Sequence, residues 1–127
     1  MKGTIDYSDL KNKPEKHELE VANYFLSLGY DVVFIRPSNI KGVHRPDILM
    51  LGIEWEIKCP TGNTKNTIEN NIKKAIQQSS NIILDLRGLR LAQDKAIAQI
   101  REQFVKRQKI RKIYVIKADG GSLKLER

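Results

Sequence analysis

The sequence predicts a single mixed α/β domain in which helices flank a central sheet of parallel and antiparallel strands. Segments with helical spacing of apolar residues alternate with short runs rich in Val, Ile and Phe. No internal repeat or linker divides the 127 residues, which suffice for one hydrophobic core. The expected order is an αβββαβ core followed by a further helix and strand. We assign residues 14–127 to this domain and the polar residues 1–13 to a flexible N-terminal arm.

The first helix is predicted over residues 14–29, because Pro14 favours a helix start and Gly29 favours a stop. Its apolar residues form one broad arc, and Glu18 lies near the middle of that arc. An ionised carboxylate there is costly unless it is paired or bound to a metal. A first-turn carboxylate also gains from the helix dipole, so Glu18 has both a functional and a local interpretation.

The middle of the chain is predicted to form a hairpin that carries three charged residues. A two-residue Gly52–Ile53 loop would place Asp47 opposite Lys58. Because side chains alternate along a strand, Asp47, Glu56 and Lys58 then share one face. The other face is apolar and consists of Ile48, Met50, Trp55, Ile57 and Cys59.

The remaining elements surround this hairpin. We expect a strand at residues 31–35 and a loop at 36–45 before it. After it we expect helices at 67–80 and 92–106 and strands at 82–86, 112–117 and 122–126. The strand at 82–86 is nearly all apolar, which is typical of a strand buried on both faces.

The charged face of the hairpin predicts a metal-dependent phosphodiesterase site. Asp47, Glu56 and Glu18 supply the oxygen ligands that Mg²⁺ prefers, with Mn²⁺ and Zn²⁺ as alternatives. Such a metal lowers the pKa of a bound water, and Lys58 would orient that water or stabilise charge at phosphorus. From this segment alone, an ordinary solvated face with a cross-strand ion pair is the alternative interpretation.

Five further residues are candidates for substrate contact, because they lie near the acids in sequence or on the following helix. They are His44, Thr61, Asn71, Lys74 and Gln78. The last three share one flank of the helix expected at 67–80, at helical spacing. A solvated polar surface explains each of them equally well.

The net charge of +8 favours a polyanionic partner, because cations attract and neutralise phosphates. Basic residues concentrate late in the chain, where we expect them to hold backbone phosphates without reading sequence. They are Arg101, Lys106, Arg107, Lys109, Arg111, Lys112 and Lys117. Aromatic residues make up only 6% of the chain, which disfavours a stacking platform and favours shape recognition of a folded RNA.

Several other classes of protein are disfavoured. The single Cys59 excludes an intrachain disulfide and a cluster of thiolate ligands. No apolar run is long enough for a membrane-spanning segment, and no signal peptide is visible. The oligomeric state is left open by the sequence.

Pro46-Asp47, then Glu56-Ile57-Lys58, with Glu18 as the first-helix acid, resembles the PD-(D/E)XK nuclease superfamily. This resemblance implies a restriction-endonuclease-like fold. A closer resemblance spans residues 14–117 and includes His17-Glu18, Arg45-Pro46-Asp47-Ile48 and the stretch from Asn71 to Gln78. It is to the tRNA-cleaving C-terminal toxin domain of CdiA-type contact-dependent growth inhibition proteins. It implies a metal-dependent tRNA nuclease that is delivered into the cytoplasm of competing bacteria and neutralised by a cognate immunity protein.

Two other functions remain open. A DNA endonuclease of the junction-resolvase or restriction type uses the same kind of site, and a symmetric homodimer would favour it. A non-catalytic nucleic-acid-binding module on this fold would need the lysines but not the acids.

Overall fold

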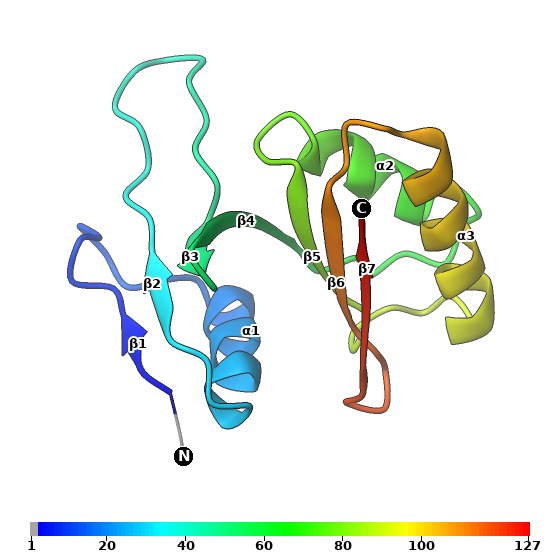
Figure 1. Cartoon of the computed structure of the whole chain (residues 1–127), viewed down its shortest axis with the longest axis horizontal. Coiled ribbons are helices and arrows are strands. Elements are labelled where there is room, and N and C mark those ends of the chain that lie inside the picture. Colours follow the sequence, from blue (N-terminus) through cyan, green and yellow to red (C-terminus); the bar gives the residue numbers. More distant parts are fainter. Residues whose placement is uncertain (1–2) are drawn as a thin grey trace.

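The computed structural model describes residues 3–127, whose strands form one seven-stranded sheet in chain order (Figure 1). The strands are β1 (Ile5–Asp6), β2 (Val32–Phe34), β3 (Ile48–Met50), β4 (Ile53–Lys58), β5 (Asn81–Asp85), β6 (Lys112–Ile116) and β7 (Ser122–Glu126). The helices are α1 (Lys16–Ser27), α2 (Thr67–Ala75) and α3 (Gln93–Lys106). The predicted mixed α/β class is confirmed.

The sheet combines both kinds of strand pairing. The pairs β1–β2, β4–β5 and β5–β6 are parallel, and the other three pairs are antiparallel. Parallel neighbours need a crossover connection, which α2 supplies between β4 and β5 and α3 between β5 and β6. Figure 1 shows β4 curving from β3 toward β5, so that it joins the two halves of the sheet.

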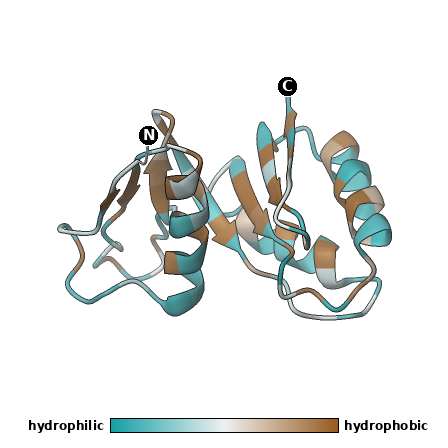
Figure 2. Ribbon diagram, turned by 90° about the horizontal axis from the view of Figure 1, so that it is seen from below, coloured by the Kyte–Doolittle hydropathy of each residue, from teal (hydrophilic) through white to brown (hydrophobic). Residues whose placement is uncertain are grey.

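Two hydrophobic clusters fill the space between the sheet and its helices. Buried side chains of α1 pack against β2, β3 and β4 in one cluster, and α2 and α3 cover β5 and β6 in the other. Figure 2 shows the apolar segments concentrated on the strands between the helices. Ile83 belongs to the first cluster, while Ile82 and Leu84 belong to the second. The expectation that this strand is buried on both faces is therefore confirmed.

Residues 3–13, which were expected to form a flexible N-terminal arm, contact the rest of the domain. Ile5 pairs with Val32 in the sheet, and Thr4 N donates a 2.9 Å hydrogen bond to Asp31 Oδ1. Leu10 packs against the cluster under α1. The polar composition concealed this docking, because backbone pairing and one leucine are enough to hold the segment. Residues 1–2 of the expected arm lie outside the described residues.

The β3–β4 hairpin differs in register from the prediction. Its two-residue loop is Leu51–Gly52, with φ values of 57° and 75°, and a type I′ turn requires positive φ at both positions. Ile48 pairs with Trp55, which places Asp47 opposite Glu56 and not opposite Lys58. Because a shift of two residues preserves the alternation of faces, the apolar and charged sides of the hairpin remain as predicted.

Two helices are shorter than the sequence indicated. α1 begins at Lys16, with Glu15 as an extended N-cap residue. α2 ends at Ala75, so the helix predicted over 67–80 stops early and Gln78 lies in the following turn. There, Ser79 Oγ donates to Glu54 O at 3.0 Å and ties the turn to β4.

Candidate active site at the β3–β4 hairpin

Asp47 stands just before β3, where backbone groups from two neighbouring segments fix it. Its backbone N donates to Trp55 O at 2.9 Å, and its backbone O accepts a hydrogen bond from Ile35 N at 3.0 Å. Its side-chain Oδ2 accepts a 2.8 Å hydrogen bond from Ile57 N. The half-buried carboxylate is thus held in one position without a charged partner in these bonds.

Glu56 is only 3% exposed and lies between Lys58 and Gln78. Lys58 Nζ is 3.4 Å from Glu56 Oε2. With its amide nitrogen turned toward the acid, Gln78 donates to Oε1 and Oε2 at 2.9 and 2.8 Å. Burial, and then the charge of Asp47, raises the pKa of Glu56 to about 8, although Lys58 acts in the opposite direction.

Glu18 reaches the same place from the first turn of α1. Its Oε1 accepts a 3.1 Å hydrogen bond from Glu15 N, so it caps its own helix. Burial raises the pKa of Glu18; the bond from Glu15 N lowers it, and the neighbouring Asp47 raises it again. Glu18 is therefore both a cap of its own helix and a neighbour of Asp47.

Asp47 is the common neighbour of Glu18 and Glu56, and its charge raises the pKa of both. Across residues 3–127, no three acidic, histidine or cysteine side chains are already arranged as metal ligands. The donor set nevertheless fits a hard divalent cation, because carboxylate oxygens are its preferred ligands and its charge would offset their repulsion. Glu18, Asp47 and Glu56 are the residues that could hold it.

Asp47 lines two cavities. The first has a volume of about 220 Å³, and it is lined by Leu10–Glu15, Glu18, Phe34, Ile35, Pro37 and Asp47. The second has a volume of about 190 Å³, and its wall includes His44 and other residues of the loop between β2 and β3. His44 therefore shares a cavity with Asp47.

The other expected substrate contacts are placed differently. Asn71 Nδ2 donates to Thr67 O within α2 at 2.8 Å, and Lys74 is exposed on the same helix. Thr61 is exposed, with its methyl group beside Gly88. In the described part of the chain, no hydrogen bond or ion pair joins these three residues to the acids. Gln78 contacts Glu56 because it lies beyond the end of α2, and it does not continue the predicted helical flank.

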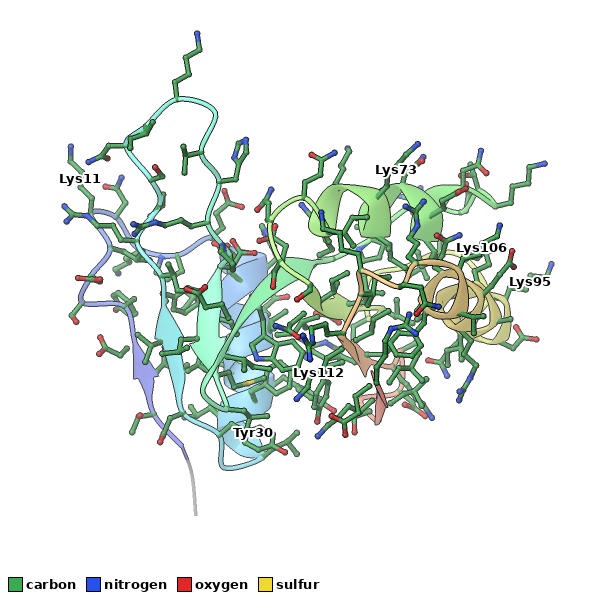
Figure 3. All side chains as sticks on the ribbon, turned by 45° about the horizontal axis from the view of Figure 1, so that its top comes forward. Lys11, Tyr30, Lys73, Lys95, Lys106 and Lys112 are labelled. Carbon is green, nitrogen blue, oxygen red and sulfur yellow. The ribbon has the colours of Figure 1, made fainter. Side chains whose placement is uncertain are left out.

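The late basic residues are partly neutralised by acids of the same chain. Lys106 pairs with Glu102, Arg107 with Glu69, and Lys112 with Glu126, at 3.5, 3.8 and 3.6 Å. Figure 3 shows Lys95 and Lys106 at the opposite side of the molecule from Lys11. Three of the seven late basic residues thus have carboxylate partners. Lys11 and Lys13, which sequence reasoning did not single out, line the cavity at Asp47.

A further buried acid, Asp85, does not join the site. Arg87 Nη2 lies 2.8 Å from Asp85 Oδ2, and Arg87 also donates to Glu20 O at 3.3 Å. This ion pair ties β5 to α1, and its charges are satisfied by each other. Asp85 is therefore a structural acid, in contrast to the three carboxylates around Asp47.

The fold and the site together define a mixed α/β domain in which an acid of α1 and an acid and a lysine of β4 converge beside Asp47, which stands just before β3. The family model of the contact-dependent growth inhibition CdiA C-terminal domain matches residues 44–121, which is more than half of the chain. The chain belongs to this family. The matched region contains Asp47, Glu56 and Lys58.

The fold is also that of a solved structure. A chain of a CdiA-CT/CdiI toxin and immunity complex from Burkholderia pseudomallei superposes with a TM-score of 0.73. The match covers 98% of this chain and 100% of that chain at 20% sequence identity, so it establishes similarity of fold alone. No curated protein sequence matches the chain. Over residues 3–127, no helix has the length and apolar character needed to cross a bilayer.

Proposed function

We propose that the chain is the toxin domain of a contact-dependent growth inhibition system and acts as a metal-dependent ribonuclease on tRNA. The observation that carries this proposal is the convergence of Glu18, Asp47, Glu56 and Lys58 in a CdiA C-terminal domain. Paired carboxylates beside a lysine, on a helix and a hairpin of a mixed sheet, resemble the site of PD-(D/E)XK nucleases. The net charge of +8 supports a polyanionic substrate.

Glu18, Asp47 and Glu56 would hold Mg²⁺ or a similar divalent cation, as their oxygen chemistry fits. When bound, such an ion neutralises charge on the phosphate and lowers the pKa of a water molecule. Gln78 and the backbone N of Ile57 orient Glu56 and Asp47, and such supporting bonds set the geometry of metal ligands.

Lys58 acts on the reacting phosphate directly. Its ammonium is half-buried and lies 3.4 Å from Glu56 Oε2. In a partly desolvated site, a fixed cation stabilises the negative charge that develops on the phosphoryl oxygens as the nucleophile attacks. The same group can orient the attacking water, because it carries three N–H donors.

We also propose a cognate immunity protein as the partner of this chain, and the cytoplasm of a target bacterium as its place of action. The related fold from Burkholderia pseudomallei comes from a complex of toxin and immunity protein. Membership of the contact-dependent growth inhibition family supports the same type of partner for this chain.

The experiment that tests the activity is incubation of the purified protein with total tRNA and with duplex DNA, each with Mg²⁺ and with EDTA. Asp47→Asn is the matched control, because its amide oxygen still accepts the bond from Ile57 N but its charge as a metal ligand is lost. We expect discrete tRNA fragments that require both Mg²⁺ and Asp47. Cleavage of DNA alone would identify a DNA endonuclease, and binding without any cleavage would identify a non-catalytic module.

A further inference from the structure

We propose that Tyr7, Lys11 and Lys13 form a nucleotide subsite that holds the RNA strand on one side of the cleaved phosphate. We refer to these three residues as the Tyr7–Lys13 subsite. The inference rests on the proposed nuclease function and adds to it the part of the chain that binds the strand beside the reacting group.

The segment that carries this subsite is fixed to the rest of the domain. Leu10 N donates to Tyr7 O at 3.0 Å, and Ser8 N donates to Asp6 Oδ1 at 2.8 Å. Pro14 is buried at the end of the segment, and a residue before proline is restricted to extended conformations. Lys13 is therefore presented in a defined backbone geometry, which lowers the entropy lost when a ligand binds.

The same segment borders the acids. Residues Leu10–Glu15 form a wall of the cavity of about 220 Å³ that also contains Glu18 and Asp47. Lys11–Lys13 also line a second hollow, of about 570 Å³, together with Ile5–Ser8. A strand that leaves the phosphate at Asp47 would therefore pass over the two lysines into the hollow that contains Tyr7.

Charge favours these lysines as the phosphate contacts of the site. The ionised carboxylates around Asp47 repel a polyanion, so cations at the rim of the site help to bring phosphates close. Lys11 and Lys13 are exposed, and neither forms an ion pair within residues 3–127. Figure 3 shows Lys11 at the outer edge of the molecule, on the side away from Lys95 and Lys106. The ion-paired Lys106, Arg107 and Lys112 are weaker candidates for phosphate contact, because a phosphate would have to displace their carboxylate partners.

Tyr7 supplies a surface for a base. Its side chain is 41% exposed, and no other aromatic side chain among residues 3–127 is as exposed. Single-stranded parts of RNA are bound by stacking of an unpaired base on an aromatic ring, with lysines along the backbone. One aromatic beside two lysines fits one nucleotide, which agrees with the low aromatic content of the chain.

The test measures binding without cleavage, with fluorescently labelled bulk tRNA in EDTA and anisotropy recorded from 50 to 300 mM salt. The variant is Lys11→Ala/Lys13→Ala, and the control is Lys65→Ala/Lys95→Ala, which removes the same charge from exposed lysines that have no expected role in phosphate binding. Loss of two phosphate contacts should weaken binding about 10-fold or more near 0.1 M salt and lower the slope of log K against log salt by about 1.4–1.8. The control should bind within about 2-fold of the wild type.

Tyr7 is tested by a pair of substitutions in the same assay. Tyr7→Leu should weaken binding several-fold, since stacking on one base contributes roughly 1–3 kcal/mol, while Tyr7→Phe should bind like the wild type. Equal binding of tRNA by the Lys11/Lys13 variant and its control would overturn the subsite. A Lys11/Lys13 variant that lost affinity for duplex DNA but kept its affinity for tRNA would also overturn it. Absence of cleavage by the wild type would instead refute the proposed nuclease function, and the binding comparison would still decide the subsite.

Discussion

At the residue scale, the surroundings of Glu56 connect the stability of the fold with the chemistry of the site. The side chain is buried beside Asp47, and only Lys58 and Gln78 offset the cost of its charge. A buried carboxyl with a raised pKa favours its protonated form in the folded state. A divalent cation binds the ionised form of Glu56, so its binding must overcome this preference. The stability of the protein therefore depends on both the pH and the divalent cation.

This link predicts that the metal-free protein becomes less stable as the pH rises from about 5 to about 8. The pKa of Glu56 is raised from 4.5 to about 8, so the folded state holds a proton that the unfolded chain releases. The resulting stability is complete below pH 4.5 and is lost as the pH approaches 8, with a slope on the order of 1 kcal/mol per pH unit. Urea unfolding in EDTA at pH 5, 6, 7 and 8 measures it.

Glu56→Gln should flatten this dependence, because the amide has no proton to lose. Glu54→Gln is the matched control, since Glu54 is an exposed carboxylate on the same strand. A profile for Glu56→Gln that is as steep as that of the wild type would show that another group is responsible for the pH dependence.

At the scale of the elements, the end of α2 and the turn of the β3–β4 hairpin determine the geometry around Asp47. α2 stops at Ala75, and the following turn brings Gln78 to Glu56 on the charged face of β4. The hairpin turn aligns Asp47 with Glu56 across two strands. A periodic pattern in the sequence predicts helices and strands but not their ends. The end of α2 and the hairpin turn were therefore not predicted correctly.

The position of Gln78 predicts that Gln78→Ala raises the Mg²⁺ concentration required for cleavage by about 10- to 100-fold. Loss of a bond that orients a metal ligand typically costs this much in affinity. Gln77→Ala is the control, because Gln77 is exposed and adjacent. Cleavage rates measured against Mg²⁺ concentration would distinguish this positioning role from contact with substrate, which would change the KM for tRNA and leave the Mg²⁺ requirement unchanged.

The hairpin turn predicts two opposite effects on stability. Leu51 has a φ of 57°, a conformation that costs an L-residue with a bulky side chain roughly 1–2 kcal/mol. Leu51→Asn should raise the free energy of unfolding by about 0.5–1 kcal/mol, because Asn before Gly suits a type I′ turn.

Gly52→Ala should lower the free energy of unfolding by about 1 kcal/mol, because a φ of 75° is unfavourable for a residue with a Cβ. Steric contact does not contribute, since the added Cβ would meet no atom within 4 Å. Urea unfolding of the two single variants tests both signs. If Leu51→Asn proved destabilising, the turn would not be of this type.

At the scale of the whole molecule, one sheet connects the site to both hydrophobic clusters. β4 carries Glu56 and Lys58, pairs with β3 on one side and with β5 on the other, and packs against α1 through Trp55 and Ile57. Glu18 attaches α1 to the same place. A ligand that joins the three acids would thus bridge elements that separate when the domain unfolds.

We therefore expect divalent cations to stabilise the entire domain. At 100 times its dissociation constant, Mg²⁺ or Mn²⁺ should add about 2.7 kcal/mol to the free energy of unfolding. For a chain of this size, that gain corresponds to a rise in Tm of roughly 10 °C. Thermal unfolding with the metal and with EDTA at pH 8 measures it, and Asp47→Asn should abolish the difference. Equal Tm values for the wild type in both buffers would contradict a metal site at these acids.

Much of the fold was predictable because it follows from local periodicity. The spacing of apolar residues predicts the helix around Phe25, the burial of Ile82–Leu84 on both faces and the apolar face of the hairpin. The grouping of Asp47, Glu56 and Lys58 on one face followed from the same alternation. It was unaffected by the wrong register, because an even shift leaves every side chain on its own side.

The order of the principal elements and the identity of the charged residues at the hairpin were determined by the sequence alone, because helical and strand periods are properties of neighbouring residues. Only the tertiary structure decided the docking of residues 3–13, the approach of Gln78 to Glu56 and the pairing of three late basic residues with acids. Each of these depends on segments that are distant in the chain or beyond the end of an element. Their proximity follows from how the sheet and its helices pack, for which no local pattern exists in the sequence.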